Sequence, residues 1–274
     1  AVFISLEGEV ERKACYENPS HFPCIFEYAY LARPDAVIDK ISVMKSRLRM
    51  GQYLGKKILS LFPDHDIDAV IPIPESSTTT AIEVAKTLGV SYREGFVKNR
   101  YIGRTFIMPK QEMRSKSVRR KLNPVSYEFK DKNILLIDDS IVRGTTSKQI
   151  VEMVKKVGAK KVYFASAAPP VRFQNVYGID MAATSELIAH QRNEKQIADF
   201  IGADWLVYQD LSDLILAAQE GNSEIENFET SIFDGKYICG SVTEEYLLNL
   251  EIDRKDSNKP VSYTHLRAHE TTDN

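Results

Sequence analysis

The sequence has few of the features that mark secreted, membrane-bound or zinc-binding proteins. Only three of its 274 residues are cysteine, and they form no CxxC pair and no zinc-like Cys/His spacing. We therefore expect reduced thiols and a cytoplasmic location. No apolar run approaches the roughly 20 residues of a membrane-spanning helix, and the first ten residues lack the basic and apolar regions of a signal peptide. We expect neither a membrane protein nor a secretory precursor.

The charge is nearly balanced overall but unevenly distributed. Lys and Arg number 36 against 38 Asp and Glu, for a formal net charge of −2. Residues 98–121 nevertheless hold nine basic residues and a single acid, Glu112. Such a segment attracts polyanions, either a nucleic acid or a small molecule with several phosphates, unless it is only a solvated basic face.

Short apolar runs alternate with amphipathic segments in the middle of the chain. Residues 69–74 are apolar, 75–80 polar, and 81–88 amphipathic before Gly89, which predicts a strand, a loop and a helix. The pattern returns with a strand over 133–139, a loop, a helix ending before Gly158 and a strand over 161–167. Buried strands alternating with helices predict an α/β fold with a parallel sheet covered on both faces. Ligands of such sheets bind at the carboxyl ends of the strands.

The remaining segments give weaker signals. Residues 97–124 combine Gly, Pro and the basic run with little periodicity, which predicts a long mobile loop or a loosely held hairpin. We expect a helix over 211–220, a strand over 233–238 and a terminal helix over 243–250. Residues 261–274 change abruptly in character, and we interpret them as a non-native tail.

Two adjacent acids at a strand end are the most informative feature. Asp138 and Asp139 follow a buried strand, where carboxylates are costly unless a cation or hydroxyl groups meet them. A glycine and three hydroxyl residues follow at a helix start, where free N–H groups form an anion cradle. These are Gly144, Thr145, Thr146 and Ser147. The alternative is that the acids merely end a strand and a hydroxyl merely caps a helix. The GxxxxGK[ST] and GxGxxG motifs are absent.

The segment 134–146, ILLIDDSIVRGTT, resembles the phosphoribosyl-pyrophosphate signature of type I phosphoribosyltransferases. Further segments narrow the resemblance to the glutamine phosphoribosylpyrophosphate amidotransferase family, over roughly residues 14–250. They are Phe22–Tyr28, Ala32–Asp35, Val70–Glu75, Phe96–Ile107 and Tyr177–Asp180. The resemblance implies a type I phosphoribosyltransferase fold with helices flanking a parallel sheet and a long mobile basic loop.

The resemblance also implies an activity and a site. The family makes 5-phosphoribosylamine, the first committed intermediate of purine synthesis, when ammonia displaces pyrophosphate from 5-phosphoribosyl pyrophosphate. The resemblance implies a magnesium site at Ser76, Asp138 and Asp139. The two aspartates would also contact the ribose, and Ser77 would contact the substrate. Residues Arg143, Gly144, Thr145, Thr146 and Ser147 would hold the 5-phosphate, and Lys98, Tyr101 and Arg104 would act from the closing basic loop.

Further positions match functional positions of the family, and for some of them a purely structural role stays open. Tyr30, Arg104, Ile107 and Leu187 match residues that line an ammonia channel, and each could equally be packing. The family also implies purine nucleotide inhibitors and a homotetramer or homodimer. Some relatives bind an iron–sulfur cluster through four cysteines. Only one cysteine stands at these positions here, so we expect no cluster; the four are Cys24, Asn175, Glu229 and Ile232.

The family's glutaminase half, with its N-terminal cysteine nucleophile, has no counterpart that we recognise, because residue 1 is alanine. We interpret residues 1–28 as the end of that half and its linker, and 29–260 as the phosphoribosyltransferase domain. We expect this chain to use free ammonia and not glutamine.

Two other functions stay open. A salvage enzyme that transfers phosphoribose to a nucleobase would share the Asp138–Ser147 loop but not the sequence around residues 98–107. A regulator that binds nucleic acid would need a DNA-reading element, and we find none, so we expect no nucleic-acid partner.

Overall fold

The computed structural model of the chain describes residues 1–99 and 122–254. At its centre lies a five-stranded sheet of order β11-β10-β9-β5-β6, in which every pairing is parallel. The strands are β5 (Ala69–Pro72), β6 (Ser91–Tyr92), β9 (Asn133–Asp138), β10 (Lys161–Ser166) and β11 (Trp205–Tyr208). The predicted α/β fold with a parallel sheet is confirmed.

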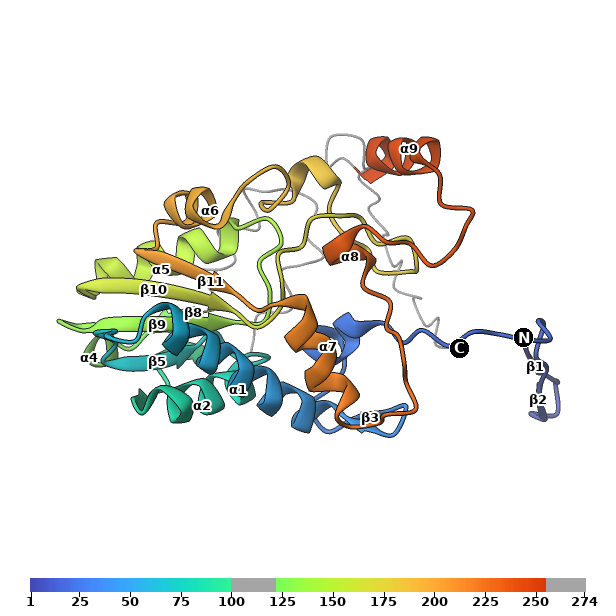
Figure 1. Cartoon of the computed structure of the whole chain (residues 1–274), viewed down its shortest axis with the longest axis horizontal. Coiled ribbons are helices and arrows are strands. Elements are labelled where there is room, and N and C mark those ends of the chain that lie inside the picture. Colours follow the sequence, from blue (N-terminus) through green and yellow to red (C-terminus); the bar gives the residue numbers. More distant parts are fainter. Residues whose placement is uncertain (100–121, 255–274) are drawn as a thin grey trace, which may run out of the picture.

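Helices cover both faces of this sheet, with α5 and α6 on one side and α1 and α2 on the other (Figure 1). The α-helices are α1 (Val43–Leu61), α2 (Thr78–Leu88), α4 (Ser126–Phe129), α5 (Thr145–Lys156), α6 (Glu194–Ile201), α7 (Leu211–Gln219), α8 (Ser231–Asp234) and α9 (Glu244–Arg254). The described residues also include a π-helical turn, η1 (Glu27–Leu31), and a 3-10 turn, η3 (Thr184–Glu186). No helix within the described ranges has the length and apolar content needed to cross a membrane.

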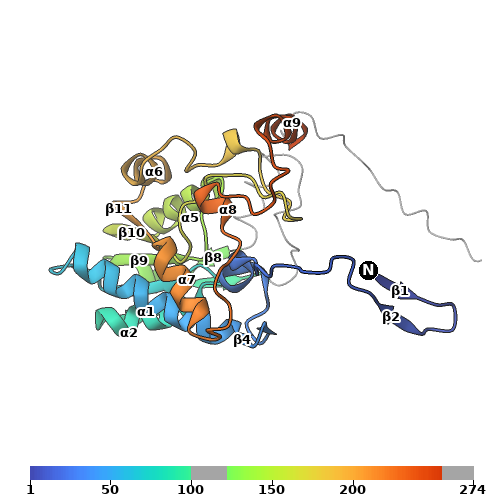
Figure 2. The ribbon, with the colours of Figure 1, turned by 45° about the vertical axis from the view of Figure 1, so that its right-hand side comes forward.

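Among the described residues, three antiparallel ribbons stand outside the central sheet. They are β1 (Val2–Ile4) with β2 (Val10–Arg12), β3 (Val37–Ile38) with β4 (Ile41–Ser42), and β7 (Phe96–Lys98) with β8 (Leu122–Pro124). Figure 2 shows the β1–β2 ribbon standing away from the sheet and its helices. The β7–β8 pair agrees with the hairpin alternative for residues 97–124, whose central residues 100–121 lie outside the described part.

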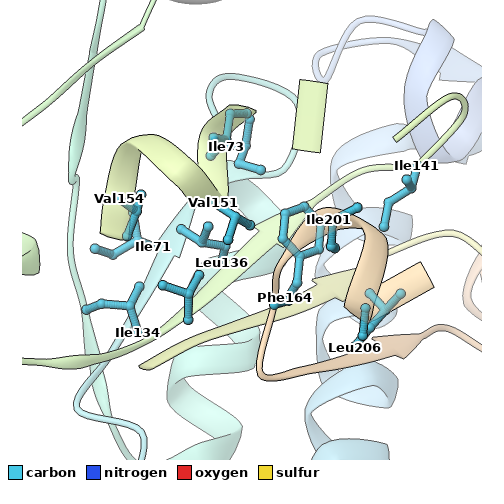
Figure 3. Packing of buried hydrophobic residues seen from close by; sticks show 14 of the residues in the cluster. Ile71, Ile73, Ile134, Leu136, Ile141, Val151, Val154, Phe164, Ile201 and Leu206 are labelled. Atoms are coloured by element: carbon cyan, nitrogen blue, oxygen red, sulfur yellow. The ribbon is translucent and has the colours of Figure 1, made fainter. Parts of the chain in front are cut away.

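The central strands are apolar between their end residues because both of their faces are buried there. In β9, Ile134 and Leu136 pack with α5 and α6 (Figure 3), while Leu135 and Ile137 pack with α1 and α2. A third cluster lies beside the sheet and includes Ile25 and Phe26 from the N-terminal segment. The described part of the chain therefore has a core on each face of the sheet and a third core alongside.

Predictions for the C-terminal third succeeded in part. The expected helices over 211–220 and 243–250 are α7 and α9. The strand expected over 233–238 is wrong, because the helical turn α8 occupies Ser231–Asp234 and ends at Gly235, which has φ 73°. Ile232 and Phe233 face the third core cluster from that turn. Their apolar character reflects burial in a helical turn, which a short run of β-favouring residues does not distinguish from a strand.

The connections diverge at one place in the sheet. From β5 the chain crosses through α2 to β6, whereas from β9 it crosses through α5 to β10 in the opposite direction. Helices α2 and α5 lie on opposite faces of the sheet (Figure 1). The loops that follow the carboxyl ends of β5 and β9 therefore turn away from each other, toward opposite faces. This is the topological switch point, where open α/β sheets bind their ligands.

Helices α1 and α2 approach each other closely at two glycines of α1. A Cβ atom on Gly51 would overlap the carbonyl oxygen of Thr80, and one on Gly55 would lie 2.7 Å from Cβ of Thr87. We expect Gly51→Ala to lower the free energy of unfolding by about 1–3 kcal/mol, because the clash with a backbone atom outweighs the ~1 kcal/mol that alanine gains in helix propensity. Urea unfolding measures the change. Gly240→Ala is the control, because nothing lies within 4 Å of its added Cβ. Equal stability of the two variants would contradict the expected clash.

Candidate functional site at the switch point

The acidic pair lies at the carboxyl end of β9, at the switch point. Asp138 is the last residue of β9, and its carboxylate accepts a hydrogen bond from the backbone N–H of Asp139 at 3.0 Å. The carbonyls of both acids accept backbone hydrogen bonds from the segment after β10, from Ala167 and Ala168, at 2.9 Å each. Asp139 is 7% exposed. The sheet thus fixes the backbone of both acids at a buried edge.

One serine from the loop after the neighbouring strand β5 and one from the loop after β9 contact Asp139 at this edge. The hydroxyl of Ser76 donates to one carboxylate oxygen of Asp139, and the hydroxyl of Ser140 donates to the other at 2.9 Å. The hydroxyl of the buried Ser77 instead donates to the carbonyl of Ile73 at 2.5 Å. The fold therefore brings Ser76 together with the acidic pair and uses the Ser77 side chain to hold the loop.

Burial gives the two carboxyl groups unusual pKa values. Burial raises the pKa of Asp138 well above its ordinary 3.8, and the charge of Asp139 raises it further. Burial also raises the pKa of Asp139, opposed by the hydrogen bonds from Ser76 and Ser140 and by the charge of Arg47. Two neighbouring carboxyl groups in a buried site are costly to ionise together. A bound cation would lower that cost, so the site favours a cation.

The donors at this edge fit magnesium. Carboxylate and hydroxyl oxygens are hard ligands, and Mg²⁺ commonly takes one or two carboxylates together with water and substrate phosphates. Among the described residues no group of three or more His, Cys, Asp or Glu side chains gathers as a metal cluster. By the ligand preference of Mg²⁺, the carboxylates of Asp138 and Asp139 and the hydroxyl of Ser76 fit a cation whose remaining ligands are water and phosphate oxygens.

The loop after the acids leads into the first turn of α5. Gly144 is the N-cap residue with φ 73°, and it has no side chain to accept from the first N–H groups of the helix. A Cβ atom there would overlap Cδ1 of Ile188, whose backbone N–H donates to the carbonyl of Val142 at 2.8 Å. Thr145, Thr146 and Ser147 follow in the first helical turn, and Ser147 is buried. The helix start is therefore shaped to accept an anion.

Arg143 in the same loop is held by Glu186 of η3. Its Nε and Nη2 donate to one oxygen of Glu186 at 2.9 and 2.7 Å. The pair is partly buried, with side-chain exposures of 18% and 24%. Together with the Ile188–Val142 hydrogen bond, this pair fastens the loop between β9 and α5 to residues 186–188.

The second helix start at this edge belongs to α2. Its N-cap, Ser77, makes no side-chain capping bond to the helix because its hydroxyl is committed to Ile73. Helices α2 and α5 both begin where β5 and β9 end, on opposite faces of the sheet. Two positive helix ends thus flank the acidic pair.

Sequence reasoning missed Arg47 of α1, which is 2% exposed. Its Nε donates to the carbonyl of Tyr28 at 3.0 Å and its Nη2 to the carbonyl of Ala32 at 2.9 Å. Its charge also acts on Asp139. A signal existed in the sequence, because Arg47 stands at helical spacing in an otherwise apolar stripe that includes Val43, Met50 and Leu54.

We expect Arg47→Leu to lower the free energy of unfolding by about 2–4 kcal/mol. The substitution leaves two carbonyls of the η1 segment without their donor and removes the positive charge that acts on Asp139. Arg47→Lys keeps the charge but not the paired donors, so its loss should be intermediate. Urea unfolding of the three proteins tests this order. A change below about 0.5 kcal/mol for Arg47→Leu, which is usual for surface positions, would contradict it.

The basic loop is described only at its base. Lys98 ends β7, and its Nζ lies 3.2 Å from a carboxylate oxygen of Glu75, a second residue that sequence reasoning missed. Tyr101, Arg104 and Ile107 lie outside the described residues. Of the other two proposed channel positions, Leu187 is fully buried and Tyr30 lies against the ring of Phe26, with ring centroids 5.6 Å apart.

Of the four positions that match iron–sulfur ligands in some relatives, Cys24 and Glu229 are neighbours in the fold. Cys24 and Glu229 form an isolated parallel β-bridge, and burial chiefly raises the pKa of the Cys24 thiol to about 11. Asn175 and Ile232 are buried. The Asn175 side chain accepts from the backbone N–H groups of Tyr177 and Ile179. The expectation of no cluster stays a prediction from the missing cysteines.

Several known proteins are similar to this chain in sequence and in fold. Residues 48–173 match the phosphoribosyl transferase domain family. The amidophosphoribosyltransferase of Pseudomonas aeruginosa is 58% identical over 262 residues, which cover 96% of this chain and 52% of that protein. The Escherichia coli amidophosphoribosyltransferase is 57% identical, with coverages of 95% and 52%.

A solved structure agrees with these relatives. The glutamine phosphoribosylpyrophosphate (PRPP) amidotransferase from B. subtilis, complexed with ADP and GMP, superposes with a TM-score of 0.71 at 34% identity, and the match covers 90% of this chain and 54% of that one. The chain thus spans about half the length of the curated relatives it matches. Over that half, it belongs to the amidophosphoribosyltransferase family and has the type I phosphoribosyltransferase fold.

Proposed function

We propose that this chain catalyses the attack of ammonia on 5-phosphoribosyl pyrophosphate, which yields 5-phosphoribosylamine and pyrophosphate. This reaction is the first step of de novo purine synthesis. One observation carries the proposal: an acidic pair at the switch point is flanked by two helix starts. The substrate has matching chemistry, with a phosphate at one end, a diphosphate at the other and ribose hydroxyls between them.

Each part of the substrate has a group that suits it. The α5 start, with Gly144 and the three hydroxyl residues after it, suits the 5-phosphate. The carboxylates of Asp138 and Asp139 accept hydrogen bonds from the ribose hydroxyls, and the loop before α2 suits the diphosphate. When bound at Ser76, Asp138 and Asp139, Mg²⁺ would supply positive charge that neutralises the diphosphate.

The reaction needs electrostatic stabilisation more than a strong base. The bond from C1 to the pyrophosphate oxygen breaks and its electron pair goes to pyrophosphate, while the nitrogen lone pair forms the new bond to C1. The nitrogen then loses one proton to solvent or to pyrophosphate. The sugar becomes positive and the leaving group negative, so the acidic pair stabilises the first charge and Lys98 the second. Tyr101 and Arg104 are proposed to join Lys98 when the basic loop closes and excludes water.

The wider assignments are proposals of the same kind. In a protein as long as the curated relatives, the ammonia would come from glutamine, with residues 1–28 leading from that half into a phosphoribosyltransferase domain over 29–260. The three cysteines are free thiols, which favours a reducing, cytoplasmic compartment. Because the B. subtilis structure is a complex with ADP and GMP, we also propose inhibition by purine nucleotides. A homotetramer or homodimer completes these proposals.

A panel of nitrogen acceptors tests the proposed reaction. Pyrophosphate release from 5-phosphoribosyl pyrophosphate with Mg²⁺ is measured with ammonium, glutamine, adenine, guanine or hypoxanthine as the acceptor. We expect ammonium alone to support turnover by this chain. Turnover with a nucleobase and not with ammonium would instead assign salvage phosphoribosyl transfer to the same site.

A further inference from the structure

The loop between β5 and α2 carries an acid where the proposed function places a diphosphate. Glu75 directly precedes Ser76, and its carboxylate lies 3.2 Å from Nζ of Lys98 at the end of β7. Both side chains are accessible, with exposures of 71% for Glu75 and 39% for Lys98. The pair joins the β5 loop to the base of the basic loop.

A carboxylate at this position opposes the binding of a diphosphate unless a cation lies between them. Lys98 is the cation that the structure pairs with Glu75. An ammonium group on a flexible four-carbon stem exchanges partners readily, and an exposed ion pair is only weakly stabilising. Breaking the pair therefore costs little, and an incoming diphosphate carries more negative charge than one carboxylate.

We propose that Glu75 is a positioning residue that holds Lys98 in the ligand-free site and releases it to the diphosphate when substrate binds. The inference rests on the proposed function of the site and adds a residue to it. Glu75 keeps the lysine at the mouth of the site, and its carboxylate competes with the ligand for the same cation. The competition weakens the binding of pyrophosphate, and so favours release of the product.

Binding of inorganic pyrophosphate tests the proposal without relying on turnover. Calorimetry at low ionic strength with Mg²⁺ is carried out on the chain, on Glu75→Gln, on Lys98→Gln and on the double variant. We expect Glu75→Gln to bind pyrophosphate more tightly, by up to about fivefold. In the Lys98→Gln background the same change should give less than half of that gain, because no lysine remains to be released. The gain should also shrink as salt is added.

The exposed ion pair between Lys40 and Glu224 provides a matched control. Glu224→Gln removes an equally exposed carboxylate from the Lys40–Glu224 pair, whose atoms lie 2.9 Å apart away from the switch point, and it should leave the affinity unchanged. No gain from Glu75→Gln, or an equal gain with and without Lys98, overturns the proposal, since the latter indicates plain charge repulsion. A wild-type chain that binds no pyrophosphate overturns the proposed function and this inference with it. Binding without the gain overturns the inference alone.

Discussion

The double substitution Asp138→Asn and Asp139→Asn is expected to reduce ammonia-dependent pyrophosphate release by roughly 10³-fold or more. Asparagine keeps the shape of each side chain and one acceptor oxygen, replaces the other oxygen with an N–H donor, and removes both negative charges. The variant can stabilise neither a magnesium ion nor the positive charge that develops on the ribose. Steady-state release of pyrophosphate under saturating ammonium measures the loss.

Stability provides the control for this variant, because a loss of activity through unfolding must be separated from a loss of charge. Both acids have pKa values raised above 3.8, chiefly by burial. The folded state therefore holds more protons than the unfolded state as the pH rises above about 4, and the wild-type chain loses stability over that range. The asparagine variant lacks this loss. We expect it to be at least as stable as the wild type at pH 8 without Mg²⁺, as measured by thermal unfolding. A marked loss of stability would contradict the account of the buried pair.

The substitution Gly144→Ala is expected to raise the KM for 5-phosphoribosyl pyrophosphate at least about tenfold, since a misplacement of 1 Å can cost more than that. The added Cβ would overlap Ile188 Cδ1, and the backbone at φ 73° disfavours any side chain. The loop must move away from residues 186–188, which carries the α5 start and its N–H groups out of position. We also expect a loss of about 1–3 kcal/mol in the free energy of unfolding.

Gly89→Ala is a matched control for the backbone effect. Gly89 ends α2 at φ 69°, and nothing lies within 4 Å of its added Cβ. It should lose stability through backbone strain alone and leave the KM unchanged. If the two variants show the same KM, the α5 start does not hold the phosphate and the assignment of this loop is wrong.

The sequence predicted the elements whose apolar periodicity is uninterrupted. Strands β5, β9 and β10 read as short apolar runs because both of their faces are buried, and α5 shows its apolar stripe clearly. Helix α1 was not predicted, although it is the longest helix among the described residues. Its buried stripe contains Arg47 and two glycines, which serve the site and the close contact with α2. The features that hid this helix are the ones that the tertiary structure requires.

The candidate site was predicted where its residues are contiguous in the chain. The loop from Asp138 to Ser147 carries its chemistry in one segment, so its composition alone indicates an anion and cation site. The pairing of Ser76 with Asp139 depends on β5 and β9 being neighbours in the sheet, and that of Glu75 with Lys98 on where the β7–β8 ribbon lies beside it. Local patterns do not encode that order. The same limit applies to Arg47, whose partners Tyr28 and Ala32 belong to a separate segment.

The most direct test of the central claim is pyrophosphate release from 5-phosphoribosyl pyrophosphate by this 274-residue chain with Mg²⁺, measured with and without ammonium. The acidic pair between two helix starts predicts turnover that depends on ammonium and that the double asparagine variant lacks. Release that is absent, or equally fast without ammonium, from a chain that binds the substrate would contradict ammonia transfer at the switch point.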